Sequence, residues 1–117
     1  MCCFINDGHG NFTKKELPDE LQLAPVFSFA ALPANGKGNY LAAGNFYGVI
    51  PYEGRYDALL PSVISFNKQV NKFQFQLTMP IADGEVRDAK WIRYADGKKV
   101  LIVAQNNKAL TFLKPNE

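Results

Sequence analysis

The sequence predicts an all-β fold of short antiparallel strands, and two features indicate it. Clusters of Gly, Asn and Asp recur between short apolar segments, as they do at turns between strands. Residues 73–77 alternate strictly between apolar and polar side chains, which is typical of a half-buried strand. Helical patterning is nearly absent, because the one candidate turn, residues 16–23, contains Pro18, which interrupts a helix.

The predicted strands follow one another along the whole chain. They span residues 2–6, 12–17, 26–32, 40–43, 62–66, 73–77, 86–94, 100–105 and 109–113. The first two flank Asp7-Gly8-His9-Gly10-Asn11, which is a strong hairpin signal. A second hairpin tip is expected at residues 67–72, and a turn at residues 95–98.

Two parts of the sequence recur after about 60 residues. With Val26 placed over Val86 (86 − 26 = 60), residues 40–45 fall on residues 100–105. Each copy then consists of a strand, a polar loop with glycine, a second strand and an amide residue. The first hairpin recurs as well, with Phe12 falling on Phe73 (73 − 12 = 61). A unit of this size with about four strands fits one blade of a β-propeller with an inserted loop.

The repeat therefore predicts antiparallel four-stranded blades of a partial β-propeller, in one β domain spanning residues 1–117. Residues 1–18 would form a partial blade, residues 25–78 a full blade with an inserted loop at 46–61, and residues 85–113 a partial closing blade. Because a propeller has four to eight blades, this chain alone cannot close the ring, and we expect Met1 to be internal to a longer ancestral or actual protein. The alternative is a small β-sandwich or barrel, in which strands would pair across the 60-residue units.

Composition excludes several classes of function. The net charge is +2, and only residues 14–15 and 98–99 are adjacent basic pairs, so we expect no nucleic-acid partner. No segment approaches the roughly 20 apolar residues of a membrane span. The first residues lack the basic and apolar regions of a signal peptide. Cys2 and Cys3 are neighbours, so a disulfide between them would be strained, and both are expected to be strand residues.

Several segments resemble FG-GAP (VCBS) repeat proteins. Residues 4–12, Phe-Ile-Asn-Asp-Gly-His-Gly-Asn-Phe, look like the LNDGxGxF hairpin of that group. Residues 44–58, 84–88 and 103–107 resemble the C-terminal part of such proteins in Bacteroidota. The resemblance covers nearly the whole chain. It implies an exported or cell-surface propeller, whereas the chain carries no signal peptide, so the cellular location stays open.

The resemblance also indicates where calcium would bind. Repeats of this group hold a DxDGDGxxD loop between their first two strands, because Ca²⁺ takes six to eight oxygen ligands. The matching residues 31–40 contain no carboxylate and include Lys37, and the turn at 95–98 has only Asp96. We therefore predict degenerate calcium loops, no metal site and no cofactor.

The sequence gives little support for catalysis. His9 is the only histidine and lies at an expected hairpin tip, so no Ser-His-Asp or Cys-His arrangement is predicted, and the chain is predicted not to be an enzyme. Glu85, Arg87 and Asp88 are expected to form a structural ion pair at a blade entrance. Trp91 is expected in the core.

The inserted loop at 46–61 is the best candidate for binding. Its aromatic and charged side chains suit a stacking platform for a sugar or a protein partner. The candidate ligand-binding residues in and beside it are Asn45, Tyr47, Tyr52, Glu53, Arg55, Tyr56 and Asp57. In the alternative interpretation, which we favour, Glu53 and Asp57 satisfy Arg55 and hold the loop in place.

The sequence thus predicts a non-catalytic binding or scaffold module. The alternative is a cell-surface carbohydrate-binding or carbohydrate-processing accessory protein with a glycan partner. An incomplete propeller leaves apolar sheet faces open, so we expect self-association or a partner chain that completes the ring. The apolar residues concerned are Val26, Phe27, Phe29, Leu41, Val63, Ile64, Ile102 and Val103.

Overall fold

The computed structural model describes residues 1–33, 38–48 and 59–115. The strands are β1 (Cys2–Asn6), β2 (Phe12–Glu16), β3 (Val26–Leu32), β4 (Asn39–Gly44), β5 (Ser62–Asn67), β6 (Lys72–Thr78), β7 (Val86–Arg93), β8 (Lys99–Gln105) and β9 (Thr111–Leu113). Every predicted strand is present, with ends within two residues of those predicted. The prediction of an all-β chain is confirmed.

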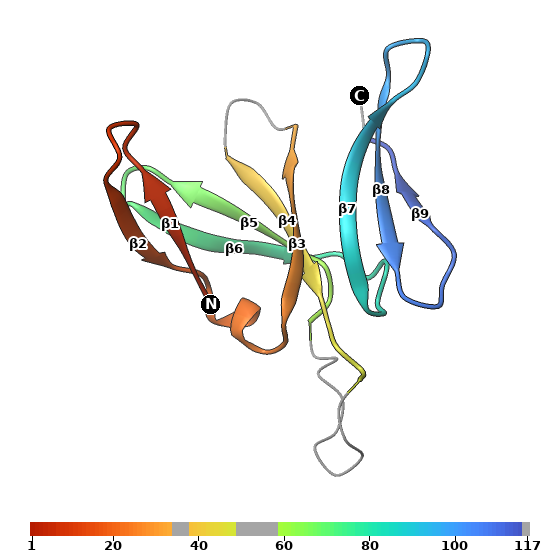
Figure 1. The fold of residues 1–117 in the computed structure, drawn as a ribbon, viewed down its shortest axis with the longest axis horizontal. Helices are drawn as coiled ribbons and strands as arrows, with labels where there is room; N and C mark the ends of the chain where they lie inside the picture. The colour runs from red at the N-terminus through yellow and green to blue at the C-terminus, as the bar shows by residue number, and fades with distance from the viewer. Residues whose placement is uncertain (34–37, 49–58, 116–117) are drawn as a thin grey trace.

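The strands form three antiparallel sheets, each ordered as in the sequence. They are the N-terminal hairpin β1-β2, the four-stranded sheet β3-β4-β5-β6 and the three-stranded sheet β7-β8-β9. The four-stranded sheet lies between the other two (Figure 1). Among the described strands no ladder joins one sheet to another, so these strands do not close into a single barrel.

One short helix connects the N-terminal hairpin to β3. It is the 3-10 helix η1 (Asp19–Gln22), which begins directly after Pro18. Proline is tolerated there because its missing N–H group would have no helical partner. Leu21 of this turn is fully buried and anchors the connection. No helix in the part of the chain that the structure describes is long and apolar enough to cross a membrane.

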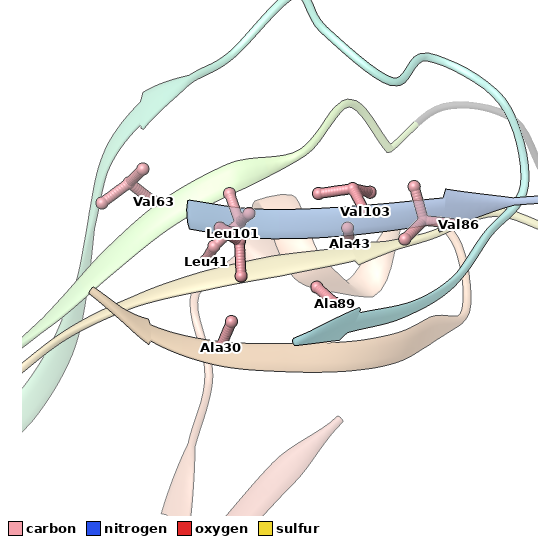
Figure 2. Packing of buried hydrophobic residues seen from close by; sticks show 8 residues of the cluster. All are labelled: Ala30, Leu41, Ala43, Val63, Val86, Ala89, Leu101 and Val103. Carbon is pink, nitrogen blue, oxygen red and sulfur yellow. The ribbon is translucent and has the colours of Figure 1, made fainter. Parts of the chain in front are cut away.

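The first apolar cluster lies between the four-stranded and three-stranded sheets (Figure 2). Its buried members are Ala30, Leu41, Ala43, Val63, Val86, Ala89, Leu101 and Val103. Trp91 packs against this cluster, and its indole N–H donates a hydrogen bond to the carbonyl of Ala31 at 2.6 Å. Trp91, which was expected in the core, is partly buried at the edge of this cluster, and its hydrogen bond links β7 to β3.

A second apolar cluster covers the opposite face of the four-stranded sheet. It joins that sheet to η1 and to the segments beside it, through Leu17, Leu21, Ala24, Ala42, Leu59 and Ile64. Because successive strand residues point to opposite faces, Leu41 enters the first cluster and Ala42 the second. The four-stranded sheet is thus the middle layer, with apolar residues on both faces.

The repeat seen in the sequence has a counterpart in strand pairing. Val26 pairs with Gly44 and Val86 with Gln105, and each ladder has an irregularity at its next pair. The expected register of the second strand is nevertheless wrong by one residue. Gly44 corresponds to Gln105 (105 − 44 = 61), because the paired residues Val86 and Gln105 are one residue further apart in the sequence (105 − 86 = 19) than Val26 and Gly44 (44 − 26 = 18).

The hairpin repeat needs a similar correction. Asn6 pairs with Phe12, whereas Asn67 pairs with Lys72, so Phe12 corresponds to Lys72 and not to Phe73. The cause is the tip, which holds five residues in the first hairpin and four in the second. Phe73 pairs with Phe66, and their rings lie 5.0 Å apart.

Candidate functional site

The ends of four strands meet in a cluster of polar side chains. β4 ends and β8 ends at this point, while β3 and β7 begin there. We call the cluster the polar corner. It consists of Asn45, Tyr47, Glu85, Arg87 and Asn106. It therefore connects the four-stranded sheet to the three-stranded sheet through residues at the strand ends and just beyond them.

Asn45 is fully buried, and its side chain bonds to two backbone groups. Its Oδ1 accepts a hydrogen bond from the N–H of Leu59 at 3.0 Å, and its Nδ2 donates to the carbonyl of Gly84 at 3.3 Å. Its φ is +79°, a left-handed conformation that Asn tolerates better than most residues. Gly44 before it is required, because a Cβ there would lie 1.8 Å from the carbonyl oxygen of Pro25. Asn45 thus ties the predicted inserted loop at its two ends.

Glu85 is the buried carboxylate of the corner, with 6% of its surface exposed. Its Oε1 accepts hydrogen bonds from the backbone N–H of Tyr47 at 2.7 Å and from Arg87 Nη2 at 3.1 Å. Its Oε2 accepts one from Asn106 Nδ2 at 2.9 Å. A buried carboxylate is stable only with such partners, so these bonds explain why the charge is retained.

The predicted ion pair between Glu85 and Arg87 is confirmed, but Asp88 is not part of it. Arg87 Nη2 lies 3.1 Å from the Glu85 carboxylate. Asp88 instead lies 3.7 Å from Lys90 Nζ, with both side chains exposed. Arg87 lies at the irregularity of the β7-β8 ladder and has no partner in its register, whereas Asp88 is paired with Ala104.

Arg87 also packs on two aromatic rings at the surface. Its guanidinium carbon lies 4.8 Å from the ring centre of Phe27 and 5.6 Å from that of Phe46. The two rings are 6.5 Å apart and meet edge to face. Phe27 is 47% exposed, so this stack forms an accessible surface above the buried carboxylate. A cation over exposed rings contributes about 0.5–1 kcal/mol.

A second, exposed ion pair borders the corner. Lys108 Nζ lies 2.8 Å from Asp83 Oδ1, and the Tyr47 hydroxyl donates a hydrogen bond to the Asp83 carbonyl at 3.4 Å. The hydrogen bond from Lys108 lowers the pKa of Asp83 below its ordinary value, and the same bond raises the pKa of Lys108. Because this pair is solvent-exposed, it contributes charge to the surface and little to stability.

Of the predicted ligand-binding residues, the structure brings together Asn45 and Tyr47. Tyr52, Glu53, Arg55, Tyr56 and Asp57 lie outside the described residues. The prediction missed Phe27 and Asn106 as members of this region. The repeat could have identified Asn106, because an offset of 61 residues between the second strands of the two copies aligns Asn106 with Asn45.

The turn at residues 7–11 and the turn at residues 95–98 use their carboxylates internally. Asp7 accepts hydrogen bonds from the N–H of His9 at 2.7 Å and from the side chain of Asn11 at 2.8 Å, and these bonds lower the pKa of Asp7. Asp96 accepts a hydrogen bond from the N–H of Lys98 at 3.0 Å. Among the residues that the structure describes, no group of three or more metal-ligating side chains is present. The segment 34–37 of the other expected loop lies outside them.

An apolar hollow of about 210 Å³ lies between the N-terminal hairpin and the four-stranded sheet. Its lining residues are Cys2, Cys3, Leu17, Phe29, Tyr40, Ile64 and Phe73. Both cysteines are free thiols on β1, as expected for strand residues. Burial raises the pKa of the Cys3 thiol, with a smaller contribution from Cys2. The hollow shows that the hairpin covers this sheet face incompletely.

No protein-family model, no curated protein and no solved structure matches the chain significantly.

Proposed function

We propose that the chain is a non-catalytic binding or scaffold module, built like part of a propeller of the FG-GAP (VCBS) kind. The observation that supports this most is the repeated unit. The pairs β3-β4 and β7-β8 share a register and an irregularity at equivalent positions, and their sheets pack face to face. Successive packed sheets of this kind are what a blade arrangement requires.

The polar corner supports a binding role and gives little support to catalysis. Glu85 is buried and held by several donors, so it is not poised to take a proton from a substrate. The surface above it presents Phe27, Phe46 and Arg87, a combination of aromatic rings and one guanidinium. Aromatic residues and arginine are enriched among the residues that contribute most to protein interfaces. We therefore place the binding surface at this stack.

A carbohydrate ligand is the second candidate. Exposed aromatic rings offer an apolar surface to a sugar ring, and Arg87, Asp83 and Lys108 offer donors and acceptors near it. This arrangement suits a cell-surface carbohydrate-binding accessory protein. It differs from the scaffold proposal in requiring a free glycan to bind at the polar corner.

The experiment that separates the two follows backbone amide resonances during titration with a panel of oligosaccharides. A glycan site predicts saturable shifts at Tyr47 and Arg87, abolished by Phe27→Ser and retained in Arg93→Ala, an exposed arginine elsewhere on β7. Absence of shifts across the panel would reject the carbohydrate candidate.

The scaffold proposal is tested by protein capture with the same variants. It predicts a partner whose capture is lost in Phe27→Ser and Arg87→Ala and retained in Arg93→Ala. A partner that binds all of these variants equally would move the binding surface away from the polar corner.

A further inference from the structure

One face of the three-stranded sheet carries exposed apolar side chains. Ala89, Leu101 and Val103 point into the first apolar cluster, so by strand alternation their neighbours point the other way. We call this opposite side the outer face. Its apolar members are Ile92, Val100, Ile102, Ala104 and Phe112, of which Val100 is fully buried. Ile102 pairs directly with Phe112, which is 52% exposed, so two large apolar side chains lie side by side.

The outer face repeats a face that is covered elsewhere in the same chain. In the corrected register, Leu32 corresponds to Ile92 and Leu41 to Ile102. Val63 pairs with Leu41 as Phe112 pairs with Ile102, so these two also correspond. Leu41 and Val63 are buried under the three-stranded sheet, and Leu32 packs against the same cluster. These three positions of the sheet-to-sheet interface are thus apolar in both copies.

The outer face also carries charged residues. Ala30 corresponds to Lys90, which is the one clear change from apolar to charged. The Lys90 side chain is exposed and lies 3.7 Å from Asp88. A long lysine side chain can keep its ammonium group in water while its stem covers apolar surface.

The four-stranded sheet carries the matching surface, which the second apolar cluster covers only in part. Ala89, Leu101 and Val103 correspond to Phe29, Tyr40 and Ala42, which lie on the face toward the N-terminal hairpin. The N-terminal hairpin reaches this face of the four-stranded sheet near the edge strand β6, which β2 contacts (Figure 1). Phe29, on the edge strand β3, remains 46% exposed and lines the 210 Å³ hollow. We call Phe29 and Tyr40, with the hollow beside them, the β3 face.

We propose that the outer face of one copy of this chain packs on the β3 face of a second copy, head to tail. The chain contains this interface once internally, between its four-stranded and three-stranded sheets. The outer face and the β3 face correspond to the two sides of that interface, and each lies on a sheet face that the other sheet does not contact. Burying two apolar sheet faces against each other removes apolar surface from water, which lowers the free energy of the system. The contact joins two different surfaces, so it is heterologous and can continue from copy to copy. The inference rests on the repeat and is independent of the binding surface at the polar corner.

The test measures molar mass by light scattering after size exclusion. We expect a wild-type mass that exceeds one chain and rises with concentration. Phe112→Asp blocks the outer face, and Phe29→Asp blocks the β3 face. Each is expected to weaken association by at least about 30-fold, the size of effect at a central interface residue. Val70→Asp places the same charge on an exposed residue at the tip of the β5-β6 hairpin and should retain association. Circular dichroism confirms that each variant folds.

Mixing the variants distinguishes this contact from other modes of association. Phe112→Asp retains its β3 face and Phe29→Asp retains its outer face, so the two together should form a discrete dimer that neither forms alone. A monomeric wild type would overturn the proposal. So would association lost in Phe112→Asp but unchanged in Phe29→Asp, which indicates a symmetric contact between outer faces.

Discussion

Asn45 and Asn106 occupy equivalent positions at the ends of β4 and β8. The N–H of Asn45 donates a hydrogen bond to the carbonyl of Pro25 at 3.0 Å, and the N–H of Asn106 donates one to the carbonyl of Glu85 at 2.9 Å. Pro25 and Glu85 each precede the first residue of the partner strand. The two side chains then differ in their partners, since Asn45 binds backbone groups and Asn106 binds the Glu85 carboxylate. The repeat therefore preserves the backbone hydrogen bond at the end of each strand pair, whereas the side-chain contacts of the two asparagines differ.

Replacing Asn45 is expected to destabilise the fold strongly. Asn45→Ala leaves the Leu59 N–H and the Gly84 carbonyl without this partner and places Ala in a left-handed conformation. These effects together predict a loss of about 3 kcal/mol in the free energy of unfolding, measured by urea denaturation. Asn107→Ala is the control, because Asn107 also has a positive φ but is exposed, and it should cost about 1 kcal/mol. Equal losses would show that the Asn45 side-chain bonds contribute nothing.

Ser28 offers a site where removing a polar atom should stabilise the protein. Among the described residues its hydroxyl is the one buried side-chain group without a hydrogen-bond partner. Ser28→Ala is therefore expected to raise the free energy of unfolding by about 1 kcal/mol. Ser62→Ala is the matched change, since the buried Ser62 hydroxyl donates to the Leu60 carbonyl at 2.8 Å, and it should lower stability by about 1 kcal/mol. The same sign for both serines would contradict the assignment.

The Cys3 thiol is expected to react slowly with iodoacetamide. Burial raises its pKa, so less of the reactive thiolate is present at neutral pH than in the unfolded chain. In a Cys2→Ser background, the pH at half-maximal alkylation rate should lie above the ordinary cysteine value in the native protein and return to it in urea. An identical profile in both conditions would show that β1 does not pack against the hollow.

Asp7 should link the stability of the first hairpin to pH. Hydrogen bonds from Asn11 and from the His9 N–H lower its pKa in the folded state. A lowered pKa contributes stability above the unfolded value, about 3.9, and that contribution is lost as the pH falls through the lower folded value. The carboxyl resonance of Asp7, followed by NMR, should titrate below the ordinary aspartate range. In Asn11→Ala the titration should move toward that range, and an unchanged midpoint would contradict the turn geometry.

The strands and turns of this fold were predictable from the sequence, whereas the polar corner was not. Turn residues and alternating side chains define strands within a few positions, so all of the predicted strands are present. The register of β4 against β8 was missed by one residue because a turn-length change alters spacing without altering strand patterns. The contacts between Glu85 and Tyr47, 38 residues apart, depend on sheet packing that periodicity does not encode.

The most direct test of the account is a set of nuclear Overhauser contacts in solution, because the account depends on separate sheets stacked with a repeated interface. Among the described strands we predict cross-strand contacts only within the three sheets, including Ser28 with Ala43 and Asp88 with Ala104, and a contact between the Trp91 indole proton and Ala31. Ladder contacts joining β2 to β3 or β6 to β7 would instead show one continuous sheet, and would contradict both the repeated unit and the functions proposed from it.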